Sequence, residues 1–204
     1  MIFMTADSHF GHRNIIKYQK RPFMTQAEMD ALEFATDRES TKAVRISNET
    51  LQKHDTAIID NINAVVMPQD TLYHLGDFCM GDGTPYRNRI NCRNVHLIKG
   101  NHDRPKDQSF WKLFASVKEL SVVRDSGKKI TLCHYPMLGW DGSHYGHWHL
   151  HGHCHGGIED FIIEHNLQHM KRIDVGVDSH DYKPWNMDEI ARAMEQKIGL
   201  GLVK

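Results

Sequence analysis

Residues 2–9 read IFMTADSH, a short apolar run that is followed at once by Asp7 and His9. An apolar run of this length is typical of a buried strand. Four further strand-like runs also lead into polar side chains, and they lie at residues 71–75, 95–98, 129–133 and 147–151. This recurring pattern, a strand that ends in a polar cluster, decides the fold that we predict.

The side chains that follow these five strands are of types that bind metal ions or transfer protons. They are Asp7 with His9, Asp77, Asn101 with His102 and Asp103, His134, and His153 with His155. In layered α/β folds, binding sites form where loops leave the carboxyl ends of the strands. Five such ends in one sheet would place these side chains around a common crevice.

The remaining pattern indicates one α/β domain. Helical spacing predicts helices over residues 28–34, 49–66, 109–114 and 187–197. Residues 118–123 and 129–133 flank the turn-like Asp125-Ser126-Gly127 and predict a hairpin, and residues 172–177 predict the last strand. Residues 35–48 are polar with weak periodicity, so we expect a single domain over 1–204 with a loop or small insertion around 31–50.

Composition excludes several classes of protein. The 204 residues are 40% hydrophobic and 25% charged, and 25 Lys plus Arg nearly balance 26 Asp plus Glu, which argues against a basic nucleic-acid-binding tail. The four cysteines contain no CxxC pair of the kind that a zinc finger needs. No apolar run reaches the roughly 18–20 residues of a membrane span, and the first residues lack a signal-peptide pattern. We therefore expect a soluble, cytoplasmic protein without a membrane partner.

Histidine is unusually frequent, with 16 in 204 residues. A zinc site usually holds four ligands, so a larger set suits two cations that share a bridging carboxylate. Here the set is Asp7, His9, Asp77, Asn101, His134, His153 and His155, which offers oxygen and nitrogen donors but no thiolate. Such donors favour Mn, Fe, Zn, Ni or Co over Ca or Mg. We expect two divalent metal ions, with Mn²⁺ favoured; two-metal centres serve phosphatases and nucleases.

The motifs, taken in order, resemble those of the calcineurin-like metallophosphoesterase superfamily. They are Asp7-x-His9, Gly76-Asp77, Gly100-Asn101-His102-Asp103, His134 and Gly152-His153-x-His155. The surrounding segments ADSHFGHRNII (from residue 6), RPF (from residue 21) and YHLGDF (from residue 73) resemble its small bacterial and phage-encoded branch. The resemblance extends from Phe3 to about Tyr182. It implies a four-layer α/β/β/α sandwich of two mixed sheets with outer helices. It also implies that the protein acts in the cytoplasm of a bacterial or phage-infected cell.

The resemblance also implies a role for each side chain. One metal ion would be held by Asp7, His9 and His155, and the other by Asn101, His134 and His153, with Asp77 bridging the pair. A hydroxide bridging the ions would be the nucleophile, because metal binding lowers the pKa of water to about 7. His102 would act as the general acid beside the leaving-group oxygen. For Asp103 two roles stay open: it orients His102, or it caps the following turn.

One departure from the superfamily concerns its protein Ser/Thr phosphatases. These carry an Asp three residues after the bridging Asp, followed by an Arg. Here Met80 and Gly81 occupy those positions, and Asp82 follows. The departure argues against a protein phosphatase and leaves the orienting partner of His102 open.

Three residues after the first motif are candidates for substrate binding. His12, Arg13 and Asn14 lie close enough to Asp7-x-His9 to contact a substrate phosphate. The alternative is that Arg13 is a solvated charge and that Asn14 caps a helix.

Other residues near the motifs have open roles. His147, His149 and His151 alternate along a strand that is too long for all of them to reach one metal pair, so we expect them on the surface or behind the ligands. Cys154 is expected to be a small buried residue. Asp178 could approach the rim of the site or serve the fold.

The function that we predict is metal-dependent hydrolysis of a phosphomono- or phosphodiester. The expected substrate is a small phosphorylated molecule, with a nucleotide or cyclic nucleotide favoured. A nuclease that acts on nucleic-acid ends is the alternative; it would need clustered Lys and Arg beside the metals and would bind in a salt-dependent way. A catalytically inactive protein-binding scaffold is a third hypothesis, and it predicts missing ligands, whereas all seven positions are filled.

Overall fold

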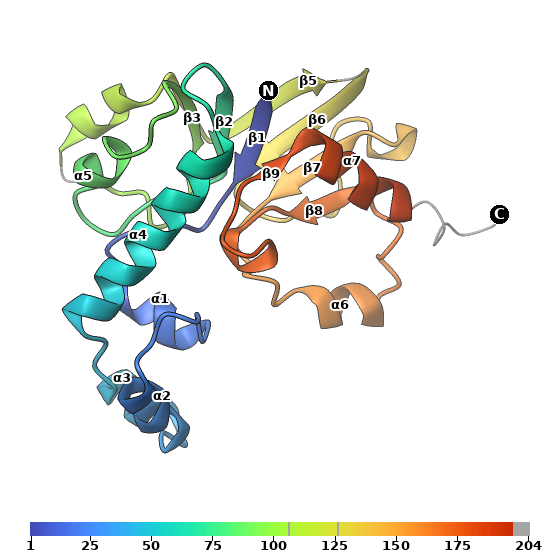
Figure 1. Ribbon diagram of the computed structural model, residues 1–204. Helices are drawn as coiled ribbons and strands as arrows, with labels where there is room; N and C mark the ends of the chain where they lie inside the picture. Colours follow the sequence, from blue (N-terminus) through green and yellow to red (C-terminus); the bar gives the residue numbers. More distant parts are fainter. Residues whose placement is uncertain (106, 126, 198–204) are drawn as a thin grey trace.

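The chain folds into two β-sheets, each of mixed strand direction (Figure 1). The computed structural model describes residues 1–105, 107–125 and 127–197. The first sheet runs in the order β4 (Ser116–Lys118), β3 (Asn94–Ile98), β2 (Thr71–His74), β1 (Ile2–Thr5) and β9 (Trp185–Asn186). The second runs in the order β5 (Leu120–Asp125), β6 (Lys128–Cys133), β7 (Trp148–His151) and β8 (Arg172–Asp174). Only β9 and β5 pair antiparallel to their neighbours among the described strands.

Helices flank both sheets. The α-helices are α1 (Arg13–Tyr18), α2 (Gln26–Glu33), α3 (Arg38–Ala43), α4 (Asn48–Val65), α5 (Thr84–Arg87), α6 (Glu159–Glu164) and α7 (Met187–Gln196). The 3₁₀ helices are η1 (Gln108–Leu113), η2 (Ser143–Tyr145) and η3 (Val177–Ser179). In the described part of the chain, no helix combines the length and the apolar character that crossing a bilayer requires.

Strand β1 shows how the layers pack. Its residues Phe3 and Met4 are both buried, and adjacent side chains of a strand point to opposite faces. Phe3 packs in a cluster with Ile58 of α4, so α4 covers the outer face of the first sheet. Met4 packs in a cluster with Leu132 and Leu150 of the second sheet, so the two sheets face each other across a shared core. The predicted fold class, a sandwich of two mixed sheets with outer helices, is confirmed.

A helical lobe projects from the sandwich at the far end of α4 (Figure 1). It contains α1, α2 and α3, and its small core consists of Ile15, Ile16, Phe23 and Ile46. Residues 35–48, predicted as a loop or insertion, contain the helix α3. The Asp37 side chain accepts a hydrogen bond from Ser40 N at 2.8 Å and starts this helix, which has no buried residues and therefore no apolar periodicity to detect.

Glu28 joins the starts of two helices in this lobe. Its carboxylate accepts hydrogen bonds from Thr25 N (2.8 Å) at the start of α2 and from Ser47 N (2.7 Å) at the start of α4. It also accepts one from Thr50 Oγ1 at 2.6 Å. Although burial alone would raise the pKa of Glu28, these hydrogen bonds lower it to about 2. The ionised carboxylate therefore links the start of α2 to the start of α4.

Two predicted strands differ from the structure, and one short strand was not predicted. The strand predicted over 118–123 is divided, because Lys118 ends β4 in the first sheet while Leu120 begins β5 in the second. The last predicted strand, over 172–177, ends at Asp174, and Val177 at its predicted end begins a 3₁₀ turn. The two-residue strand β9 was not predicted because it is too short to show a pattern. The hairpin turn predicted around Ser126 includes that residue, which lies outside the described residues.

The strand ends that carry the polar clusters come from both sheets. Strands β1, β2 and β3 belong to the first sheet, and β6 and β7 belong to the second. The expectation that one sheet supplies all five ends is therefore wrong. The two sheets instead meet so that their carboxyl ends share one edge of the sandwich.

Candidate metal centre

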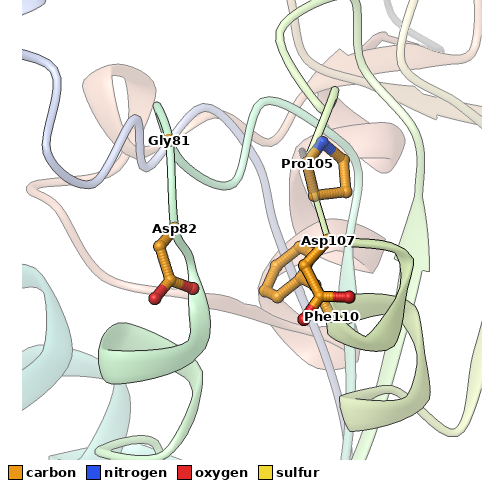
Figure 2. Close-up of a pocket in the computed structure, with 5 residues that line it drawn as sticks. All are labelled: Gly81, Asp82, Pro105, Asp107 and Phe110. Atoms are coloured by element: carbon orange, nitrogen blue, oxygen red, sulfur yellow. The ribbon is translucent and has the colours of Figure 1, made fainter.

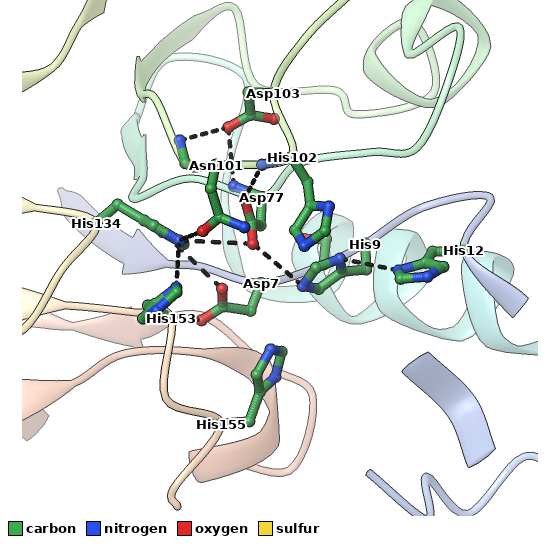
Figure 3. A network of polar contacts seen from close by, with 12 residues as sticks. Asp7, His9, His12, Asp77, Asn101, His102, Asp103, His134, His153 and His155 are labelled. Atoms are coloured by element: carbon green, nitrogen blue, oxygen red, sulfur yellow. Dashed lines mark hydrogen bonds and ion pairs between the residues drawn. The ribbon is translucent and has the colours of Figure 1, made fainter. Parts of the chain in front are cut away.

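The structure gathers the predicted ligands into two groups (Figure 3). Within each group, one ligand atom from every residue lies within 4.8 Å of the others. The first group, called site A here, is Asp7, His9 and His155. The second group, called site B, is Asp77, His134 and His153.

The donor atoms of site B converge on His134 Nε2. Nδ1 of His134 is occupied, because it donates to Leu75 O at 2.8 Å, and this leaves Nε2 facing the site. Asn101 Oδ1 and His153 Nδ1 both lie 3.2 Å from Nε2, and Asp77 Oδ2 lies 3.5 Å from it. Asn101 therefore joins site B as the amide-oxygen donor that the sequence predicts.

Asp77 lies between the two sites. Its Oδ2 atom is 3.5 Å from His9 Nε2 in site A as well as 3.5 Å from His134 Nε2 in site B. Its other oxygen, Oδ1, accepts a hydrogen bond from His102 N at 2.8 Å, which holds the carboxylate in this orientation. Burial alone would raise the pKa of Asp77, but hydrogen bonding and charge interaction with His134 lower it below its usual range, so Asp77 is ionised.

Site A leaves two buried polar atoms without hydrogen-bond partners. Asp7 Oδ2 accepts a hydrogen bond from His153 N at 2.9 Å, whereas Asp7 Oδ1 and His9 Nε2 have no partner among the described residues. Both side chains are at most 2% exposed. Buried polar atoms in proteins are nearly always paired, so each exception calls for a ligand or another explanation.

The backbone is also unusual at the ligands. Positive φ angles are found at Asp7 (56°), His9 (50°), Asp77 (54°), His153 (73°) and His155 (49°). Side-chain-bearing residues rarely adopt this left-handed region, and such strain clusters at functional sites. Five of the seven predicted ligands therefore lie in a backbone conformation that the surrounding structure must enforce.

Two glycines allow the ligand loops to approach each other. A Cβ atom at Gly100 would lie 2.2 Å from Asp77 Oδ1, and one at Gly152 would lie 2.5 Å from Asp7 Oδ2. Both distances are far below van der Waals contact. Glycine is therefore required where the strand ends of β3 and β7 meet the carboxylates.

The charges of the site call for cations. Burial raises the pKa of Asp7 well above its usual value, and the neighbouring carboxylates of Asp174 and Asp77 raise it further. Burial lowers the pKa of His9 to about 2, so His9 is a neutral imidazole and supplies no compensating charge. Ligands about 2.1 Å from a tetrahedral cation lie roughly 3.4 Å apart, close to the 3.2–3.5 Å separations of these donors. The residues present therefore fit two divalent cations.

His102 lies at the exposed side of the centre. Its ring centroid is 5.3 Å from that of His9 and 5.9 Å from that of His12, and the residue is exposed (Figure 3). This position allows the imidazole to reach a molecule bound at the two sites from the solvent side.

Asp103 supports the backbone rather than His102. Its Oδ2 accepts hydrogen bonds from Asp77 N and Gly100 N, both at 2.8 Å, and its Oδ1 accepts one from Phe78 N at 2.9 Å. No hydrogen bond joins it to the His102 ring among the described residues. Of the two roles left open for Asp103, capping the turn agrees with the structure, and a catalytic role through His102 does not.

The three candidate substrate-binding residues differ in position. The His12 Nδ1 atom lies 3.3 Å from His9 Nδ1, at the edge of site A. Arg13 points to the start of α4, where it donates to Ser47 O at 2.8 Å and to the Asn48 side chain, so its guanidinium stabilises the helical lobe. Asn14 is exposed on α1, and the residue at the N-cap is His12 rather than Asn14. The hydrogen bonds of Arg13 direct its guanidinium to the helical lobe, and a phosphate role for at least one of the three residues stays a prediction.

The additional histidines lie behind the site, as predicted for residues that are not ligands. His149 and His151 are buried, and their Nδ1 atoms donate to Thr131 O (3.0 Å) and Gly152 O (2.9 Å). Burial lowers the pKa of both imidazoles to about 4, so they are neutral. Cys154 is half-buried rather than buried, and burial raises the pKa of its thiol to about 11.

Asp178 and Arg21, whose roles the sequence left open, contact predicted metal ligands directly. Asp178 Oδ2 accepts a hydrogen bond from His155 Nδ1 at 2.7 Å, and it also pairs with the guanidinium of Arg21 at 2.6 Å. Arg21 was part of the RPF segment that carried the resemblance, and this was the one signal in the sequence that pointed to it.

A pocket of about 380 Å³ lies between the loops that follow Asp77 and Asp103 (Figure 2). Its lining residues are Gly81, Asp82, Pro105, Asp107 and Phe110. Asp82 and Asp107 accept hydrogen bonds from the backbone of their own turns. Asp82 therefore stabilises its own turn.

Comparisons with known proteins place the chain among uncharacterized relatives. No model of a known protein family matches it. It is 31% identical to the uncharacterized protein MJ1445 of Methanocaldococcus jannaschii over 203 residues, which cover 96% of this chain and 92% of that protein. It is 23% identical to the gene 66 protein of Mycobacterium phage L5, over 87% of this chain and 86% of that protein.

One solved structure shares the fold over most of the chain. A protein of unknown function from Aquifex aeolicus, AQ665, aligns with a TM-score of 0.66 and 24% identity over 94% of this chain and 98% of its own. A Vps29 mutant from Entamoeba histolytica aligns at a TM-score of 0.38 (17% identity, 76% of this chain, 64% of that one). A predicted phosphoesterase from Streptococcus pneumoniae aligns at 0.31 (15% identity, 76% and 62%). Scores this low carry no information on activity.

Proposed function

We propose that this chain, which belongs to the family of the uncharacterized protein MJ1445 of Methanocaldococcus jannaschii, is a metal-dependent phosphoesterase. Its activity is inferred from its own site, since that relative is uncharacterized. The observation that carries this proposal is the position of Asp77 Oδ2, 3.5 Å from a nitrogen of site A and 3.5 Å from a nitrogen of site B. One carboxylate facing two donor groups is the arrangement of a two-metal centre, which serves phosphoester hydrolysis. The motif resemblance to calcineurin-like metallophosphoesterases supports the same conclusion.

Each site residue has a role in this proposal. Asp7, His9 and His155 would hold one divalent cation, and Asn101, His134 and His153 would hold the other, with Asp77 facing both groups. Cations held there would supply activation of a water and neutralisation of charge on the phosphoryl oxygens. Manganese is the favoured metal, because the donors are oxygen and nitrogen without sulfur.

His102 donates the proton that the leaving-group oxygen needs. It is exposed and lies beside His9, on the open side of the two sites. A positioned acid contributes typically about 10²–10⁴-fold to the rate. His12, whose ring contacts those of His9 and His102, is placed to contact the phosphoryl group or the ester that it carries.

The substrate that we propose is a small phosphomono- or phosphodiester, with a nucleotide or cyclic nucleotide favoured. The formal charge of −1 gives the chain no excess of cations for a nucleic-acid backbone. The alternative function is that of a nuclease acting on nucleic-acid ends. A substrate screen that includes nucleic acids tests it, because the binding of a nuclease to nucleic acid would weaken steeply with salt.

The direct test is hydrolysis of p-nitrophenyl phosphate and bis(p-nitrophenyl) phosphate by chelated and Mn²⁺-loaded protein. We expect release of nitrophenol with Mn²⁺ and its loss with EDTA. A control variant is Asp70→Asn. Asp70 is buried, as Asp77 is, but it pairs with the amino terminus of the chain, away from the centre. This variant should keep its activity. Protein that hydrolyses neither ester when loaded in turn with Mn²⁺, Fe²⁺, Zn²⁺, Ni²⁺ and Co²⁺ would overturn the proposal.

A further inference from the structure

Arg21 is fully buried and uses its whole guanidinium group. Its exposed fraction is 0%, and it lies just after α1 in the helical lobe. Nε and Nη2 donate to the two oxygens of Asp178, at 2.8 and 2.6 Å. Nη2 also donates to Asp7 O at 2.8 Å, and Nη1 donates to Ser8 O at 3.2 Å. The fifth bond joins Nη1 to His54 Nε2 at 2.7 Å.

These five bonds match the five N–H donors of an arginine. Two of them end on the carbonyl groups of Asp7 and Ser8, in the loop that carries two ligands of site A. Asp7 and His9 in this loop have positive φ angles. Because this conformation is unfavourable for residues with side chains, the loop needs contacts that hold it in place. Arg21 supplies such contacts from inside the protein.

Helix α4 holds the other end of the same loop. His54 Nδ1 donates to Asp55 Oδ1 at 2.8 Å, and Asp55 accepts a hydrogen bond from Gly11 N at 3.2 Å. The chain of contacts therefore runs from Gly11 through Asp55 and His54 to Arg21. The helical lobe and α4 thus clamp residues 7–11 at both ends.

Asp178 extends the network to the third ligand of site A. Its Oδ2 accepts a hydrogen bond from His155 Nδ1 at 2.7 Å. A histidine that donates through Nδ1 keeps the proton on that atom, so the lone pair is on Nε2. A carboxylate behind a metal-binding histidine fixes the ring and its tautomer, and loss of such a partner typically weakens metal binding about 10–100-fold.

We infer that Arg21 and Asp178 form a positioning pair for site A, which sets the Nδ1–H tautomer of His155 and holds the loop of Asp7 and His9. The inference rests on the proposed function, since it requires site A to bind a cation. Arg21 and Asp178 lie 157 positions apart in the sequence. In this inference both serve site A and not site B. Site B has separate support, because His134 Nδ1 donates to Leu75 O and Asp77 Oδ1 accepts from His102 N.

The first measurement reads the tautomer of His155 in the wild-type chain. Long-range ¹H–¹⁵N NMR spectra of the metal-free full chain report the tautomer of each imidazole, with His155→Gln used to assign the His155 signal. We expect His155 to carry its proton on Nδ1. A His155 that carries its proton on Nε2 would overturn the inference, whether or not the protein binds metal.

The second measurement compares cation binding by Asp178→Asn and Arg21→Lys with the full-length wild type, by titration with Co²⁺ followed by absorbance and calorimetry. Asn keeps the size of Asp178, but its amide has only one acceptor oxygen for the three N–H groups that now converge there. We expect one of the two binding events to weaken by about 10–100-fold and the other to stay unchanged. The NMR spectrum of Asp178→Asn should show the Nε2–H tautomer of His155 gaining population.

Two controls separate positioning from general stability. Arg87 is also a buried arginine, and it donates to the carbonyl groups of Leu113, Ile90 and Cys92 away from the centre. Arg87→Lys should leave both binding events intact, and Asn101→Ala should weaken the event that Asp178→Asn spares. Folded Asp178→Asn and Arg21→Lys variants that bind both cations like the wild type would overturn the inference. A wild type that binds no cation would instead contradict the proposed function.

Discussion

Asp77 Oδ2 and His9 Nε2 face each other at 3.5 Å in the protein interior, and no hydrogen bond joins them. His9 is neutral because burial lowers its pKa to about 2, whereas Asp77 is ionised. An ionised carboxylate oxygen and an imidazole nitrogen that lie this close without a hydrogen bond between them are placed to share a cation. The unpaired buried atoms and the positive φ angles at the same residues agree with the two-cation centre that we propose.

Asp77→Asn should abolish most of the activity while preserving the fold. The amide keeps the shape of the side chain but removes the negative charge that two cations share, so we expect turnover to fall at least about 100-fold. Steady-state hydrolysis of bis(p-nitrophenyl) phosphate measures the loss, and circular dichroism checks the fold. Full activity in this variant would remove Asp77 from the centre.

His102→Ala should act selectively on substrates with poor leaving groups. An alkoxide needs a proton as it leaves, whereas a nitrophenolate does not, so alkyl esters should lose about 10²–10⁴-fold and nitrophenyl esters much less. The kcat values for the two substrate types provide the comparison. His165→Ala, a change at an exposed residue that follows α6, is the control and should affect neither. Equal losses on both ester types would exclude the acid role.

Gly100→Ala should displace Asp77. The added Cβ would lie 2.2 Å from Asp77 Oδ1 and 2.4 Å from Asp77 N, which is too close for local adjustment. Overpacking of this kind costs typically about 1–3 kcal/mol in the free energy of unfolding, and cation affinity should fall with it. Gly139→Ala is the matched control, since nothing lies within 4 Å of its added Cβ. Urea denaturation measures the free energy of unfolding of both variants, and calorimetry measures their cation affinity. A Gly100→Ala variant with the stability and cation affinity of the wild type would contradict the close approach of Gly100 to Asp77.

Glu28→Gln should destabilise the protein in a pH-dependent way. Hydrogen bonds from Thr25, Ser47 and Thr50 hold the pKa of Glu28 at about 2, below its ordinary value of 4.5. The folded state therefore binds this proton less readily than the unfolded state, so the stabilisation is complete above pH 4.5 and is lost as the pH falls towards 2. We expect a loss of about 1–3 kcal/mol at pH 7.

The measurement is urea denaturation of Glu28→Gln and wild type at pH 7 and pH 3. The difference between them should be smaller at pH 3. Glu33→Gln, at an exposed position on the same helix, should match wild type at both pH values. A difference that does not change with pH would show that the carboxylate charge is not responsible.

The residues of the candidate centre can be found from the sequence because their signals are local. Asp7, Asp77 and His134 each lie within three residues of the end of a strand, and a strand of four to six residues shows its pattern without knowledge of the rest of the fold. The assignment of the donors to two groups came from the family resemblance. The distances between donor atoms agree with that grouping.

The parts that the sequence could not supply depend on long-range contacts. Arg21 and Asp178 are 157 residues apart, and each alone reads as an ordinary surface charge. The role of Asp103 was undecided because the backbone amides of Asp77 and Phe78 approach it only in the folded chain. Arg13 was one of three candidates for phosphate binding because it lies near the first motif, but its partners lie at the start of α4, 33 to 35 residues further along.

The most direct test of the two-cation centre is anomalous diffraction from crystals grown with Mn²⁺, with data collected on both sides of the manganese absorption edge. We expect two anomalous peaks roughly 3.5–4 Å apart, one beside Asp7, His9 and His155, the other beside Asn101, His134 and His153, with Asp77 in contact with both. A single peak, or two peaks of which either lies away from Asp77, would contradict the two-cation centre.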